Sequence, residues 1–126
     1  MKEDTKKWLK LAEDDLKLSK ISLDHDILEY SVFHAQQAAE KFLKAFLAEN
    51  NVKIPKTHDL KYIISLCKSI DKSFEQLFEL KAEKLTIFST HARYPEYEFE
   101  ITREMAKEAI EIAEKVKDFV LKKLNI

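Results

Sequence analysis

The sequence contains no glycine in its 126 residues. Glycine supplies the positive φ angles and close backbone approaches on which phosphate-binding loops, dinucleotide-binding fingerprints and two-residue hairpin turns depend. This composition therefore argues against P-loop NTPases, Rossmann enzymes and hairpin-rich β folds. Because domains most often hold about 100–150 residues, we expect a single domain over residues 1–126.

The charge is nearly balanced, with 22 basic and 23 acidic residues and a formal net charge of −1. Such a molecule has no overall field that attracts nucleic acid or an anionic membrane, so any RNA contact needs a local basic patch. Cys67 is the single cysteine, which excludes an intramolecular disulfide and fits a reducing compartment. The sequence also lacks a long apolar run and a signal-peptide core, so we expect a cytoplasmic protein without membrane segments.

Apolar residues recur at helical spacing over nearly the whole sequence. This spacing predicts helices over residues 5–23, 27–49 and 57–67, one opening at 73 and running past 88, and a last one from 103, with an irregular connection over 90–101. The predicted helix N-caps are Asp26 with Glu29, Thr57, Ser73 with Gln76, and Thr102.

The expected core faces follow from the same spacing. The first helix is expected to bury Trp8, Ala12, Leu16 and Leu23, with Leu9 and Ile21 beside them. The second is expected to bury Ile27, Tyr30, His34, Ala38, Phe42, Ala45 and Phe46, and the last Met105, Ala109, Ile112, Val116 and Val120. The predicted fold is an all-α, antiparallel up-and-down bundle of four main helices plus a short helix.

The four histidines do not stand at metal-binding spacings. None follows a glutamate by three positions, no two are four residues apart, and no cysteine cluster is present. We therefore expect neither a metal nor a cofactor. Cys67 lies in an apolar stretch, where a free cysteine usually packs as a small core residue, although a neighbouring histidine would activate it as a nucleophile.

Thr57, His58 and Asp59 admit two interpretations. At a helix N-terminus an imidazole and a carboxylate lie beside free backbone amides, which together form an anion site. Alternatively, Thr57 caps the helix, Asp59 interacts with the helix dipole, and His58 bonds a neighbouring loop. On the second predicted helix, Lys41 and Lys44 are expected to be solvated. Alternatively, Gln36, Gln37 and Lys41 face a partner.

Residues 91–97 have the composition of a binding loop. Arg93 offers a planar fork for phosphate or carboxylate, and Tyr94 offers a ring on which a base can stack. Alternatively, Arg93 pairs with a carboxylate on an adjacent helix while the tyrosines seal the end of the bundle.

Four motifs in this order resemble the HEPN domain (higher eukaryotes and prokaryotes nucleotide-binding). They are Trp8 with Ala12 and Asp14-Asp15-Leu16, the block over 33–45 that contains Gln36-Gln37-Ala38-Ala39-Glu40-Lys41, Thr57-His58-Asp59-Leu60, and Ala92-Arg93-Tyr94-Pro95. The resemblance extends from Trp8 to the last helix. It implies an antiparallel α-bundle, frequently a homodimer, and often a companion to a small nucleotidyltransferase.

Many HEPN domains are ribonucleases with an Arg-x4–6-His motif near the last helix. In that motif arginine holds the scissile phosphate and histidine transfers a proton. This sequence departs from the pattern, because its arginines are Arg93 and Arg103 and its last histidine is His91. The resemblance therefore carries no catalytic residue over to this chain.

We accordingly expect a non-catalytic or degenerate HEPN protein, a homodimeric binding module partnered with a nucleotidyltransferase. The residues expected to line a nucleotide or anion pocket are Lys41, Lys44, His58, Asp59, Arg93 and Tyr94. One alternative is a metal-independent ribonuclease toxin of a toxin–antitoxin system that uses Arg93 with His91 or His58. Another is a structural adaptor without a ligand.

Overall fold

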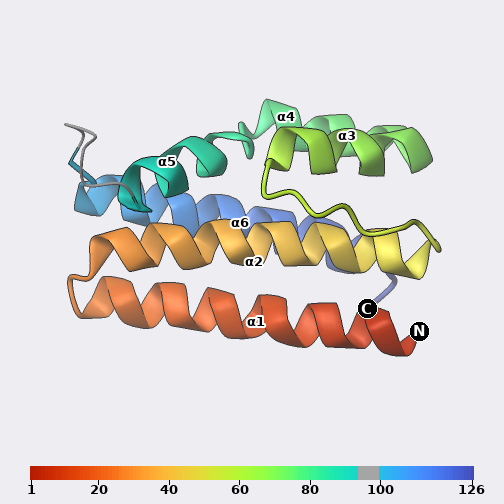
Figure 1. Ribbon diagram of the computed structural model, residues 1–126, viewed down its shortest axis with the longest axis horizontal. Helices are drawn as coiled ribbons and strands as arrows, with labels where there is room; N and C mark the ends of the chain where they lie inside the picture. Colours follow the sequence, from red (N-terminus) through yellow and green to blue (C-terminus); the bar gives the residue numbers. More distant parts are fainter. Residues whose placement is uncertain (94–99) are drawn as a thin grey trace.

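The computed structural model describes residues 1–93 and 100–126, without the side chains of 91–93, and the regular elements in these ranges are all helical. Three long helices lie lengthwise (Figure 1): α1 (Glu3–Asp24), α2 (Leu28–Glu49) and α6 (Arg103–Lys123). The shorter elements are α3 (Leu60–Ile70), the 3-10 helix η1 (Lys72–Phe74), α4 (Glu75–Glu79) and α5 (Lys84–Arg93). The predicted all-α bundle is confirmed.

Helix α2 is central, because it packs against α1, α3, α5 and α6. Its fully buried alanines allow these close approaches, and its aromatic side chains fill the remaining space. Phe46 contacts Phe74 of η1 with ring centroids 4.5 Å apart, and Phe74 contacts Phe119 of α6 at 4.9 Å. One continuous core therefore joins α2, η1 and α6.

Three residues of the predicted core faces are exposed instead: Ile21, Ile27 and Tyr30. Ile21 lies five residues from the buried Leu16, about 140° around the helix at 3.6 residues per turn. Ile27 precedes α2 and has non-helical backbone angles, so it does not continue the buried stripe. The spacing of apolar residues alone therefore predicted a wider buried face than these helices have.

Four helices end with a non-glycine residue in the left-handed region, at Asp26, Asn51, Lys81 and Asn125, with φ between 58° and 61°. In each case the next amide donates to the carbonyl five positions earlier, over 2.8–3.1 Å. This is the Schellman arrangement, in which glycine usually occupies the left-handed position. Asp26 therefore terminates α1, and its predicted role as the N-cap of α2 is wrong.

Of the other predicted N-caps, Thr102 is confirmed, since its hydroxyl accepts from the amide three residues later at 3.2 Å. The prediction for Thr57 is wrong, because Asp59 caps α3. The Thr57 hydroxyl instead accepts a hydrogen bond from the Asp59 amide at 3.1 Å. The prediction for Ser73 is also wrong. The Asp71 carboxylate accepts hydrogen bonds from the amide and the hydroxyl of Ser73, at 2.9 and 2.6 Å.

The helix expected from residue 73 past 88 is divided into η1, α4 and α5. The break lies at Lys81, whose positive φ interrupts the helix. Two helices end later than predicted: α3 continues to Ile70, and α5 extends to Arg93, into the segment expected to be irregular. Residues 94–99 of that segment lie outside the described ranges. None of the described helices combines the length and apolar character that a membrane crossing requires.

Candidate functional site

A row of buried polar residues follows α2 at four-residue spacing, which places Gln36, Glu40 and Lys44 on one face of the helix. All three residues are at most 6% exposed. The Glu40 carboxylate lies 2.8 Å from Lys44 Nζ and 2.9 Å from His58 Nδ1. Gln36 Nε2 donates to the carbonyl of His58 at 2.8 Å. Helix α2 therefore fixes both the ring and the backbone of His58, just before α3 begins.

The buried charge of Lys44 is compensated twice. Glu40 forms its ion pair, and the Lys44 ammonium lies 5.5 Å from the centre of the Trp8 ring on α1, within cation–π range. A buried charge of this kind is tolerated only when it is paired. The expectation that Lys44 is solvated is therefore wrong, because Lys44 is buried, with Trp8 of α1 against its ammonium.

A second carboxylate-centred cluster joins α1 to α2. Asp15 contacts His34 Nδ1 at 2.9 Å and Lys41 Nζ at 2.5 Å, and the Lys41 side chain is only 23% exposed. The His34 ring also contacts Tyr30 and Phe33, with centroids 6.4 and 5.2 Å away. His34 is thus a half-buried histidine with a hydrogen-bond partner, and Lys41 is paired rather than freely solvated. We call the two clusters around Glu40 and Asp15 the polar seam.

The first amides of α3 have partners. The amide of Leu60 donates to Thr86 Oγ1 on α5 at 3.2 Å, and that of Lys61 donates to the Asp59 carboxylate at 3.1 Å. An anion site at this N-terminus would need those amides free. The geometry therefore disfavours the anion site. The alternative interpretation is also wrong in two parts, because Asp59 and not Thr57 caps α3, and His58 bonds Glu40 on helix α2 and not a loop.

The structure thus brings two predicted site residues, Lys44 and His58, together around Glu40. Lys41 lies in the other cluster, and Asp59 caps α3. Arg93 is the last residue of α5, but its side chain and the whole of Tyr94 lie outside the described part of the chain. Their place in a pocket stays a prediction.

Arg103, the other arginine, contacts Asp26 at 2.5 Å and the carbonyl of Leu23 at 3.3 Å. It therefore ties the start of α6 to the turn between α1 and α2. Cys67 is buried, and burial raises the pKa of its thiol to about 12, so it packs as a core residue rather than acting as a nucleophile. Among the described residues, no group of three or more histidine, cysteine or acidic side chains is arranged to hold a metal.

Reasoning from the sequence did not assign Asp15, Glu40 or Trp8 to the candidate site, although these residues organise the polar seam. A signal for Glu40 was present, because a polar residue stands at every fourth position from 36 to 44, on a helix whose other positions are largely apolar. No comparable signal pointed to Asp15, since its partners come from another helix.

Architecture and seam together define an all-α bundle protein whose polar residues hold its helices together. A family model, the HEPN domain, matches residues 5–124. The chain is 34% identical over 139 aligned positions to a Methanocaldococcus jannaschii protein named "Putative toxin MJ1304", covering 96% of this chain and 91% of that protein. This chain belongs to the HEPN domain family.

The fold has a solved counterpart in the crystal structure of ST0689, described as an archaeal HEPN homologue. The two structures agree with a TM-score of 0.70 over 98% of each chain, at 22% sequence identity. At that identity the likeness concerns the fold alone, and it confirms that the bundle seen here is the HEPN fold.

Proposed function

We propose that this chain is a non-catalytic HEPN protein, a homodimeric binding module of the cytoplasm that works with a small nucleotidyltransferase. The observation that carries the proposal is the state of the two lysines expected to hold a ligand phosphate. Both are paired with carboxylates that are largely or fully buried, Lys41 with Asp15 and Lys44 with Glu40. A cation neutralised in this way contributes little to holding an RNA backbone.

The sequence supports the same proposal, since no histidine follows either arginine to complete an Arg-x4–6-His motif. The relative named a putative toxin supports a place in a two-component toxin–antitoxin system. Within such a system we propose that this chain contributes binding rather than RNA cleavage. A nucleotide or another anion near Arg93 and Tyr94 is part of the proposal.

An RNA cleavage assay on the purified protein tests this function. We expect no cleavage of single-stranded or structured RNA in the presence of a metal chelator. Cleavage that Arg93→Ala abolishes would show that the protein is a ribonuclease. Light scattering at micromolar concentration tests the dimer, and a monomer would contradict that part.

The second candidate is the metal-independent ribonuclease toxin, with Arg93 and His58 or His91 as catalytic residues. One observation favours His58: its side chain is 64% exposed while its Nδ1 is held by the buried Glu40. The other ring nitrogen is then available for proton transfer, as in a general base oriented by a carboxylate. In this case His58→Gln lowers cleavage by about 100-fold or more.

The ligand-free adaptor is distinguished by thermal stability. A nucleotide that binds only the folded protein must raise its melting temperature. We expect ATP or GTP to do so for the wild type and to a smaller extent for Arg93→Ala. If neither nucleotide shifts the transition, the nucleotide part of the proposal is wrong and the adaptor interpretation replaces it.

A further inference from the structure

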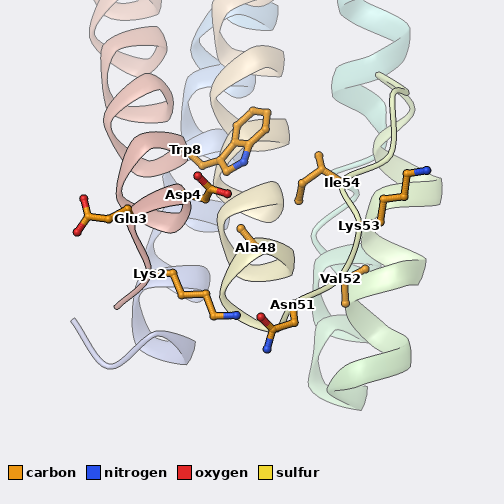
Figure 2. A pocket seen from close by; sticks show the side chains of 9 residues that line it. All are labelled: Lys2, Glu3, Asp4, Trp8, Ala48, Asn51, Val52, Lys53 and Ile54. Atoms are coloured by element: carbon orange, nitrogen blue, oxygen red, sulfur yellow. The ribbon is translucent and has the colours of Figure 1, made fainter.

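A cleft of about 570 Å³ opens at the end of the bundle where α1 begins and α2 ends (Figure 2). Its lining residues come from the first turns of α1, the last turn of α2 and the segment that follows it. Pockets for small ligands generally measure roughly 300–1,000 Å³, so the cleft is large enough for a side chain or a small molecule. None of the residues predicted for the nucleotide or anion pocket lines it.

The lining of the cleft is mixed, and its apolar part comes from four residues. The indole of Trp8 stands on one side, and Ala48, Val52 and Ile54 lie below it and across from it (Figure 2). This arrangement suits an aliphatic chain, which buries apolar surface against both walls. The indole also attracts cations, as Lys44 already shows at 5.5 Å. Because Glu40 neutralises Lys44 at 2.8 Å, that lysine repels a second cation only weakly.

Two lysines and two carboxylates line the cleft, and they differ in where their charged ends point. The Asp4 carboxylate lies beneath the indole and points into the cleft, whereas the carboxylate of Glu3 points away (Figure 2). Among the described residues no hydrogen bond or ion pair engages the Asp4 side chain, while Glu3 pairs with Lys6 at 3.2 Å. The ammonium of Lys53 points outward, and that of Lys2 reaches toward Asn51 at the rim (Figure 2).

We propose that this cleft binds a cation carried on an aliphatic stem, an alkylguanidinium or alkylammonium group. The charged head pairs with Asp4 and lies against the indole of Trp8, and the stem lies between the indole and Ile54. Two sources present this chemistry, an arginine or lysine side chain of a bound protein and a free polyamine. The site does not depend on the proposed dimer or on the nucleotidyltransferase.

Trp8 is the single tryptophan of the chain, so its fluorescence reports on the cleft directly. The probes are butylguanidine and, as an uncharged molecule with the same stem, butanol. We expect butylguanidine to change the emission saturably, less so at high salt, and butanol to have no comparable effect. Asp4→Asn should weaken the binding by about tenfold, the loss of one charge-assisted contact.

Glu3→Gln is the matched control, because it removes the same charge from the same helical turn on a side chain that points away. We expect it to leave binding within about twofold of the wild type, since only the screened long-range charge changes. Circular dichroism melting checks that both variants are folded. Equal weakening by the two variants, an equal response to butanol, or no saturable response to butylguanidine would overturn the proposal.

A second titration distinguishes the sources. Tighter binding of the peptide acetyl-Gly-Arg-Gly-amide than of butylguanidine assigns the site to a side chain of a protein partner. Tighter binding of spermidine than of either assigns it to a free polyamine. Failure of both the peptide and spermidine to bind, with butylguanidine bound, would exclude both biological sources and with them the proposal.

Discussion

Replacing Glu40 with glutamine tests whether charge compensation holds Lys44 inside the protein. The two side chains are 3% and 7% exposed and lie 2.8 Å apart. Glutamine has nearly the same volume, so the substitution opens no cavity, but it leaves the Lys44 ammonium buried without its counter-ion. Removing one partner of a buried pair costs about 3–5 kcal/mol. The contact with Trp8 persists, so we expect a loss near the lower end of this range.

That loss is large for a single domain, whose free energy of unfolding is typically about 5–15 kcal/mol. With a melting-temperature change of about 4 °C per kcal/mol, Glu40→Gln should melt roughly 12 °C below the wild type. The double variant Glu40→Gln with Lys44→Met removes both charges and leaves an apolar chain in place of the ammonium. Its stability should return to within about 1 kcal/mol of the wild type.

Urea unfolding followed by circular dichroism measures these free energies. The matched control is Glu111→Gln on α6, because Glu111 pairs with Lys115 at the same four-residue spacing, 3.2 Å apart, but on the surface. Its loss should be below about 0.5 kcal/mol. If Glu40→Gln costs no more than this control, or if Lys44→Met does not restore stability in the Glu40→Gln background, charge compensation does not hold the polar seam.

Three further predictions concern other parts of the bundle. Lys81→Gly should raise the free energy of unfolding in urea by about 1 kcal/mol, because glycine adopts the φ of 59° found at Lys81 without a Cβ clash. Lys81→Ala should give no such gain. Equal free energies of unfolding for the two variants would show that the backbone at Lys81 is not strained. Iodoacetamide at about pH 8 should label Cys67 only when the protein unfolds, since burial raises the pKa of the thiol to about 12. Labelling of the folded protein at the rate of a free thiol would contradict this prediction. Hydrogen bonds from Ser73 and Lys123 lower the pKa of Asp71 from 3.8 to about 2, so its stabilisation is present above about pH 4 and lost as the pH falls toward 2. Asp71→Asn should flatten that limb of the stability–pH profile, and an unchanged slope would show that Asp71 does not contribute there.

Much of the fold could be predicted because the helical period of apolar residues depends only on the chain itself. The long helices α1, α2 and α6 lie where that period places them, and Thr102 caps α6 as expected. The other ends were harder to predict because neighbouring residues compete for the same role. Thr57 and Asp59 can both cap a helix. The helix begins after Asp59, where the Leu60 amide also donates to Thr86 of another helix. The break at Lys81 carries no glycine or proline signal at all.

Less of the candidate site could be predicted, for a related physical reason. A lysine on a helix is assigned to the surface unless something is known to cover it and to compensate its charge. For Lys44 the counter-ion Glu40 lies on the same helix, but the cover comes from other parts of the chain. The ring of Trp8 lies on α1, and His58, which shares Glu40, lies beyond the end of α2. Glu40 stands four residues before Lys44, the spacing of a favourable pair, but this spacing does not show that the pair is buried.

The two clusters of the polar seam use the same construction. In each, one carboxylate accepts from one histidine and one lysine: Asp15 from His34 and Lys41, and Glu40 from His58 and Lys44. Apolar side chains tolerate small shifts between helices, whereas these groups leave an unpaired charge behind if either element slides. The Asp15 cluster therefore sets the register of α1 against α2, and the Glu40 cluster sets the position of the segment that leads into α3. Because both lysines are engaged in this way, their contribution is to the packing of the bundle, and neither is a free cation.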